Sequence, residues 1–374
     1  MRRLAEIPGF NIDKVAAAAG DDPYVLRMEN LDTDLDVPRG VKEATKEAVD
    51  RPEANSWLPF DGKREMKEAV ASYIERRSGV SYDPMGEVAI TSGEGEAWLN
   101  TLLVTTDPGD EVVLTDPTYA GMINRVRLAG AVPRLVPQVP GEDGWRLDLD
   151  ALRAAAGPKT RAVFIMNPCL PTGLVLNQGE WDAIAALCHE HDAWLIYAQL
   201  WEGIVFDGLP ILHPATLPDV RDRLIIAGSA ICENRTIGWR VGWTVAPEGL
   251  HDDLSKTQIY NGLVPSGILQ AGSRVALEES DEDLAKAIAE YERRRDETLR
   301  QLEGFPMVKP SGGWMALMDT ASMGMDAADA SKRMLEQKVA VTQMRGWGGE
   351  VAERYLRFVY SREPIERLQL FGER

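Results

Sequence analysis

The chain has 374 residues, which is long enough for two domains and a large core. Its 59 acidic and 41 basic side chains give a net charge of −18, which argues against nucleic acid and anionic membranes as partners, because both attract basic patches. No apolar run reaches the ~20 residues of a membrane-spanning helix, and three cysteines do not suggest a disulfide framework. The basic N-terminus lacks the apolar segment of a secretory signal, so we expect a cytoplasmic protein.

Short apolar strands alternate with helices over most of the chain. The first helices are predicted over residues 12–19, 40–49 and 65–78. The sequence then predicts strands over 87–91, 111–114, 162–166, 194–197 and 224–227, with helices over 97–105 and 178–191 and a further helix that ends near 129. Continuously apolar strands separated by helices indicate a mostly parallel sheet that is covered on both faces.

The last third of the chain has a different character. From about residue 250 it is mainly helical, and residues 280–302 are strongly charged. A strand over 314–318, a helix over 327–338 and a strand over 354–360 follow. We therefore expect an α/β protein with a large domain over 45–250, and a smaller α+β domain that combines 1–44 with 251–374.

Two segments that follow predicted strands carry groups suited to an anion. Gly93, Glu94 and Gly95 lie in a turn before a helix, where free backbone N–H groups and the helix dipole attract negative charge, although the carboxylate at Glu94 makes this turn less favourable. Farther along, Ser229 and Arg240 lie in the segment GSAICENRTIGWRVGW, and arginine suits a bidentate contact with phosphate. Near the C-terminus, Arg357 interrupts an apolar strand, where a guanidinium requires a carboxylate partner.

Together with Asp116-Pro117-Thr118-Tyr119 and the segment Asn167-Pro168-Cys169-Leu170-Pro171-Thr172-Gly173, these motifs resemble the class I/II aminotransferases, the fold type I enzymes that use pyridoxal phosphate (PLP). The resemblance covers most of the chain in the same order. It implies a two-domain subunit, a homodimer and a cleft near the subunit interface. It also implies that Ser229, Arg240 and the turn at 93–95 hold the phosphate, that Tyr119 stacks on the cofactor ring, and that Arg357 pairs with the α-carboxylate of the substrate.

Several positions depart from the family pattern, and each would touch the cofactor. Cys232 stands at the position where the family has the lysine that carries PLP, and no lysine occurs between residues 221 and 255. A thiol cannot form an imine. Ala198 stands where the family has the aspartate that keeps the pyridine nitrogen of PLP protonated. An alanine cannot do this, and the protonated ring is what makes PLP an electron sink. The family has a tyrosine and an asparagine that bond the phenolic oxygen of the cofactor, and their positions hold Trp201 and Leu170. A further tyrosine, which reaches the cofactor phosphate of the neighbouring subunit, is replaced by Trp57.

These replacements are apolar or weakly polar, so we expect a reshaped cleft that has lost PLP-dependent transamination. The leading hypothesis is a PLP-independent biosynthetic enzyme with no covalently bound cofactor, which acts on a small amino-acid-derived or carboxylated substrate in the former cofactor cleft. One alternative is a catalytically silent subunit that partners an active PLP-dependent paralogue. Another is an aminotransferase that holds PLP or pyridoxamine phosphate without a covalent bond.

The candidate catalytic residues are Cys232, as nucleophile or acid/base or else as a small apolar filler, and Glu233 and Glu202 as general bases, since a carboxylate with a raised pKa in an apolar cleft can act at neutral pH. His189 and His191 have no acidic cluster around them, so no metal site is expected. The expected substrate- or anion-binding residues are Arg357, Arg240, Ser229, Tyr119, Gly93, Glu94, Gly95, Asn167, Trp201 and Trp57.

Overall fold

The computed structural model describes residues 4, 7 and 11–373. Its centre is an eight-stranded sheet in the order β2-β9-β8-β7-β6-β3-β4-β5. The strands are β2 (Val88–Thr91), β3 (Glu111–Asp116), β4 (Val132–Gly141), β5 (Gly144–Leu147), β6 (Thr160–Met166), β7 (Trp194–Gln199), β8 (Leu224–Gly228) and β9 (Gly242–Val245). The five strands from β8 to β4 are parallel, whereas β9 is antiparallel to both its neighbours and β5 is antiparallel to β4.

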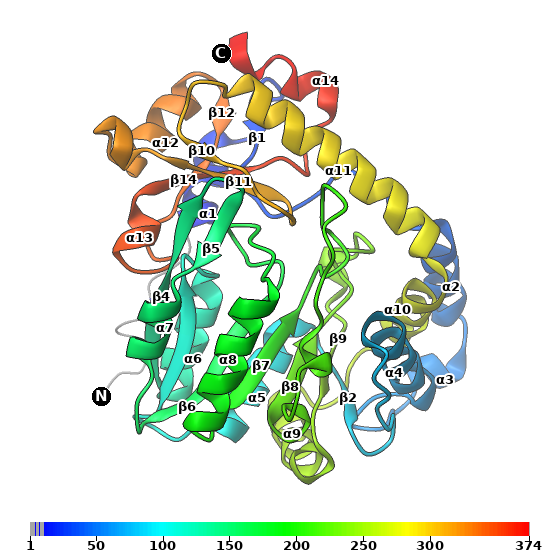
Figure 1. The fold of residues 1–374 in the computed structure, drawn as a ribbon. Coiled ribbons are helices and arrows are strands. Elements are labelled where there is room, and N and C mark those ends of the chain that lie inside the picture. The colour runs from blue at the N-terminus through cyan, green and yellow to red at the C-terminus, as the bar shows by residue number, and fades with distance from the viewer. Residues whose placement is uncertain (1–3, 5–6, 8–10, 374) are drawn as a thin grey trace.

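Helices cover both faces of this sheet (Figure 1). Those of the first two thirds are α1 (Asn11–Ala19), α2 (Arg39–Val49), α3 (Pro52–Asn55), α4 (Arg64–Ser78), α5 (Glu94–Thr105), α6 (Ala120–Ala129), α7 (Leu149–Ala155), α8 (Gln178–Glu190) and α9 (Glu248–Asn261). Trp98 of α5 packs against Phe164 of β6, and Trp181 of α8 packs against Tyr197 of β7. Phe164 and Tyr197 point to opposite faces because Tyr197 is in register with Ile165, so α5 and α8 lie on opposite sides.

A smaller antiparallel sheet lies beyond one end of the large one (Figure 1). Its strands are β10 (Met307–Val308), β11 (Met315–Asp319), β14 (Tyr355–Val359) and β13 (Thr342–Gln343), in that order. The N-terminal arm joins this half, because β1 (Leu26–Arg27) pairs with β12 (Val339–Ala340). The remaining helices are α10 (Gly267–Glu279), α11 (Asp281–Gln301), α12 (Ala327–Glu336), α13 (Glu350–Glu353) and α14 (Ile365–Leu368).

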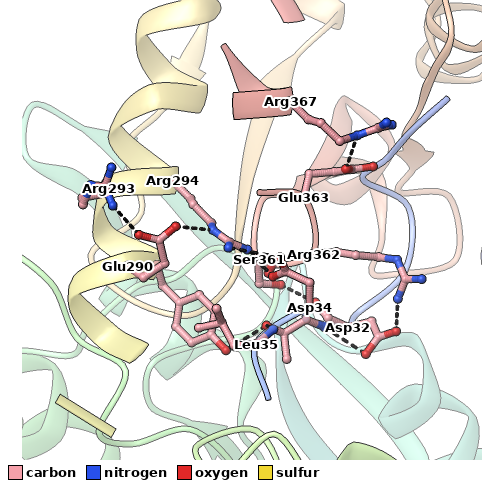
Figure 2. Close-up of polar contacts among 12 residues, drawn as sticks. Asp32, Asp34, Leu35, Glu290, Arg293, Arg294, Ser361, Arg362, Glu363 and Arg367 are labelled. Atoms are coloured by element: carbon pink, nitrogen blue, oxygen red, sulfur yellow. Dashed lines mark hydrogen bonds and ion pairs between the residues drawn. The ribbon is translucent and has the colours of Figure 1, made fainter. Parts of the chain in front are cut away.

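A polar network fixes the segment that follows β1 to the C-terminal half, as Figure 2 shows. Arg294 of α11 pairs with Asp34 at 2.6 Å and donates to the carbonyl of Ser361 at 2.7 Å. The Ser361 hydroxyl donates to the carbonyl of Asp32 at 2.5 Å, and Arg362 pairs with the Asp32 side chain. These contacts hold the arm beside the cavity described below, where Leu31 forms part of the wall.

The structure confirms the α/β class and the mostly parallel sheet with a smaller second sheet, while the domain limits at 45 and 250 stay predictions. The sequence reading missed β4, β5, α7 and β9. It also placed the start of α5 three residues too late. The helix begins at Glu94, directly after Gly93, whose φ of 90° favours glycine. Over the residues that the structure describes, no helix has the length and apolarity to cross a membrane.

Candidate active site

A cavity of about 350 Å³ lies beyond the carboxyl ends of β3, β6, β7 and β8. Ligand sites of open α/β sheets commonly occupy this position. The cavity is largely apolar, and it is lined by Ile12, Asp13, Leu31, Glu94, Trp98, Tyr119, Arg125, Leu170, Leu200, Ile231, Cys232, Ile237, Arg240 and Trp347. Four of the predicted site residues therefore meet here: Glu94, Tyr119, Cys232 and Arg240.

The predicted anion-binding groups do come together, but they face a carboxylate of the chain itself. Arg240 Nη2 lies 3.0 Å from Glu94 Oε1, and the Ser229 hydroxyl donates to Glu94 Oε2 at 3.4 Å. Gly93 favours glycine because its φ is 90°, and a Cβ there would lie 2.8 Å from Arg240 Nη2, so that the arginine would have to shift. The two glutamates that open α5 suit the positive end of a helix dipole.

Arg125 is a lining residue that the sequence analysis missed. Its Nε donates to the carbonyl of Gly95 at 3.0 Å and its Nη1 to the carbonyl of Gly121 at 2.9 Å. Its guanidinium lies 5.7 Å from the ring of Trp98 and 6.0 Å from that of Tyr119. Arg125 belongs to no motif, so only the fold distinguishes it from other arginines.

Cys232 lies at the cavity but is only 1% exposed. Burial, followed by the nearby charges of Glu94 and Glu233, raises the pKa of the Cys232 thiol well above its usual value of 9.0. The thiol is therefore protonated at neutral pH, whereas the thiolate is the nucleophile. A catalytic role for Cys232 stays a prediction.

Glu233 is the next residue in the chain, yet it is not part of the cavity wall. Its carboxylate accepts hydrogen bonds from the Tyr73 hydroxyl at 2.8 Å, from Arg77 Nη2 at 2.9 Å and from the backbone N–H of Gly203 at 2.6 Å. Glu202 is also buried and outside the wall. It accepts from the Tyr197 hydroxyl at 2.7 Å and from the Gln199 amide at 2.9 Å.

Arg357 of β14 is fully buried one aromatic ring away from the cavity. Its guanidinium lies 4.4 Å from the ring of Trp347, which in turn lies 5.8 Å from the ring of Tyr119. Arg357 Nη2 donates to the carbonyl of Glu29, whereas Nε and Nη1 have no hydrogen-bond partner among the described residues. Burial lowers the pKa of Arg357 from its usual range to about 9, so the group still carries its charge at neutral pH.

The other predicted residues are placed less directly. Trp201 is buried outside the wall, where its Nε1 donates to the carbonyl of Pro168 at 2.8 Å. The side-chain oxygen of Asn167 accepts from the N–H of Leu176 at 3.0 Å, and its Nδ2 has no partner within the described part of the chain. Trp57 is 71% exposed and packs edge-on against Phe60.

The cavity agrees only in part with the cofactor that the sequence resemblance implies. Ser229 and Arg240 are the residues that suit a phosphate, and Tyr119 is the residue that suits a ring. Cys232, however, presents a thiol where attachment requires an amine, and no lysine lies in the described wall. These residues do not fit a cofactor that is held through Cys232, so the roles assigned to the chain's side chains concern the substrate.

Residues 26–369 match the family described as aminotransferase class I and II. The chain is 30% identical to aromatic-amino-acid aminotransferase 2 of Thermococcus litoralis, over 96% of this chain and 93% of the relative. It is 31% identical to the aspartate aminotransferase of Pyrococcus abyssi over the same shares. The crystal structure of aspartate aminotransferase from Thermus thermophilus with maleate superimposes with a TM-score of 0.92 at 28% identity, covering 100% of this chain and 97% of that one.

These relatives contradict the expectation that transamination has been lost. Named aminotransferases that align over nearly the whole chain point to conventional transamination, not to a PLP-independent biosynthetic enzyme, a silent subunit or non-covalently bound PLP. The expectation of no covalently bound cofactor is overturned in the same way, since the family is PLP-dependent. The error lay in judging activity from the replaced residues alone, although the fold and the arginines are kept. The protein is an enzyme of the class I and II aminotransferase family.

Proposed function

We propose that the protein is an aminotransferase that moves the amino group of an amino acid to an oxo acid. The relatives' names, which include aromatic-amino-acid and aspartate aminotransferases, support this activity. The observation that carries the proposal is Arg357, a buried cation beside the cavity with two nitrogens that have no partner among the described residues. An isolated charge in a protein interior is costly unless it is paired.

In this proposal Arg357 binds the carboxylate of the substrate. A guanidinium makes strong, directional hydrogen bonds to a carboxylate, so one contact both binds and orients an amino acid. The rings of Trp98, Tyr119 and Trp347 contribute to the apolar wall against which the substrate side chain packs. Because this wall is largely apolar, we expect aromatic and apolar amino acids to react better than acidic ones.

The proposal is tested with a panel of donors. The purified protein, supplied with PLP, is incubated with aromatic, aliphatic, acidic and basic amino acids and with several 2-oxo acids, and the new amino acids are separated and quantified. We expect product from at least one pair, with the highest kcat/KM for an aromatic or apolar donor. If every pair leaves the amino group on its donor while the protein stays folded, the proposed activity is wrong.

We also propose that the protein is a cytoplasmic homodimer. The three buried cysteines are all free, which suits a reducing compartment. Exposed apolar side chains support a contact between two copies: Trp57 packs edge-on against Phe60, and Tyr260 and Leu263 are also exposed. In sedimentation we expect twice the mass of one chain, and we expect Trp57→Glu to shift the protein toward the monomer. A wild-type protein that is monomeric at micromolar concentration would contradict this.

A further inference from the structure

Two guanidinium groups and one buried hydroxyl meet at the first turn of α5, and one of the chain's own carboxylates lies among them. We propose that Glu94 is an internal competitor for an anion site in the cavity, and that Arg125 is the second cation of this site beside Arg240. The ligand is a phosphate group, free or as part of a larger molecule. The family resemblance assigns Ser229, Arg240 and the backbone turn at 93–95 to a phosphate, whereas the proposal concerns the side chains of Glu94 and Arg125, to which the resemblance gives no such role.

The guanidinium groups of Arg125 and Arg240 both lie close to the backbone of Gly95. A Cβ on Gly95 would lie 2.6 Å from Arg125 Nη2 and 3.7 Å from Arg240 Nη2. The two guanidinium groups are therefore close enough for one phosphate group to contact both. Ser229 is 1% exposed, and its hydroxyl faces the same place through its contact with Glu94.

The charges at this point do not balance with Glu94 alone. Arg240 pairs with Glu94, whereas Arg125 contacts only carbonyl oxygens and aromatic rings, and it forms no ion pair with any described carboxylate. Two cations thus have one carboxylate in contact, since Asp13, which also lines the cavity, forms no ion pair with either arginine. A phosphate group carries about −1.5 to −2 charges at pH 7 and three strong acceptor oxygens, so it matches the two guanidinium groups better than a single carboxylate does.

Glu94 is held by contacts that a ligand can replace. Its contact with the Ser229 hydroxyl, at 3.4 Å, is long for an O–H···O hydrogen bond. Its partner Arg240 keeps 44% of its side chain exposed. A phosphate that enters the cavity can therefore take over Arg240 and Ser229 while the Glu94 carboxylate turns toward water. The carboxylate lowers phosphate affinity in two ways, because it occupies these donors and because it repels the incoming charge.

The test is calorimetric titration of the full-length protein with inorganic phosphate. Glu94→Gln keeps the size of the side chain and removes its charge, so it is expected to raise the affinity about tenfold or more. Glu96→Gln is the matched control. It removes the same charge from the same helical turn, but its carboxylate accepts from the N–H of Ser92 and does not contact either arginine. This control is expected to bind phosphate like the wild type.

Adding Arg125→Met to Glu94→Gln is expected to cancel most of the gain, with near-ultraviolet circular dichroism as the check of folding. Equal affinity of Glu94→Gln and wild type would overturn the proposal. So would an equal gain in Glu96→Gln, since that would reflect net charge, and an unchanged gain without Arg125 would remove Arg125 from the site. A parallel titration with PLP identifies the source of the phosphate group: an equal gain assigns the site to the cofactor's phosphate, and a gain for inorganic phosphate alone assigns it to another ligand.

Discussion

Replacing Arg357 by leucine is expected to lower kcat/KM for amino transfer by about 30- to 5,000-fold, because a buried charge pair that loses one partner costs about 2–5 kcal/mol. The loss should appear mainly in KM, since the carboxylate is bound in the ground state as well as in the transition state. Arg357→Lys keeps the charge but not the planar fork, so an intermediate loss is expected. Steady-state kinetics with the best donor of the panel measures both.

The same change is expected to leave stability unchanged or to raise it. In the free protein Arg357 is a buried cation that forms no ion pair with any described carboxylate, and the nearby Glu29 pairs with Arg27 instead, so an apolar side chain of similar size removes a desolvation cost. Arg354→Leu is the matched control on the same segment. Its partner Asp319 forms a partly exposed pair, which contributes little to stability or activity. Activity of Arg357→Leu equal to that of the wild type would show that Arg357 does not bind the substrate.

Replacing Glu233 by alanine is expected to destabilise the fold by about 3–5 kcal/mol, because it leaves the buried Tyr73 hydroxyl and the largely buried Arg77, whose side chain is 20% exposed, without their acceptor. Glu233 is 2% exposed and accepts from Tyr73, Arg77 and Gly203, so all three donors lose an acceptor. For a chain of this length the thermal midpoint should fall by about 5 °C. Glu233→Gln keeps an acceptor oxygen and should lose less. Differential scanning calorimetry measures the midpoints.

This prediction separates two roles for Glu233. A general base can be replaced with a large loss of kcat and little loss of stability. A buried hydrogen-bond acceptor behaves in the opposite way. If Glu233→Ala keeps its thermal midpoint and loses its activity, Glu233 is catalytic, and the structural reading of its three contacts is wrong.

The order of strands and helices could be predicted because most strands are short apolar runs between turns. β4 escaped notice because Pro133, Pro137 and Pro140 interrupt it, and proline normally argues against a strand inside a sheet. β9 is only four residues long and follows directly after the Arg240 motif, so its residues were read as part of that motif. Both strands exist because tertiary pairing overrides the local signal.

The site could be predicted only where a sequence motif marks it. Glu94, Tyr119, Cys232 and Arg240 were found in this way. Arg125 and Trp347 were not, because they come from a helix and a loop whose positions depend on the packing of distant segments. Local sequence was also misleading at Glu233, which is adjacent to Cys232 in the chain but bonds to Tyr73 and Arg77 and lies outside the cavity wall.

Isotope transfer tests most directly whether this protein transfers amino groups. The protein is purified to homogeneity, supplied with PLP, and given a ¹⁵N-labelled amino acid with an unlabelled 2-oxo acid, and the new amino acid is analysed by mass spectrometry. We expect ¹⁵N in the new amino acid, at a rate that Arg357→Leu lowers and Arg354→Leu does not. Absence of ¹⁵N from the product, or the same rate in wild type and Arg357→Leu, would contradict the proposed activity.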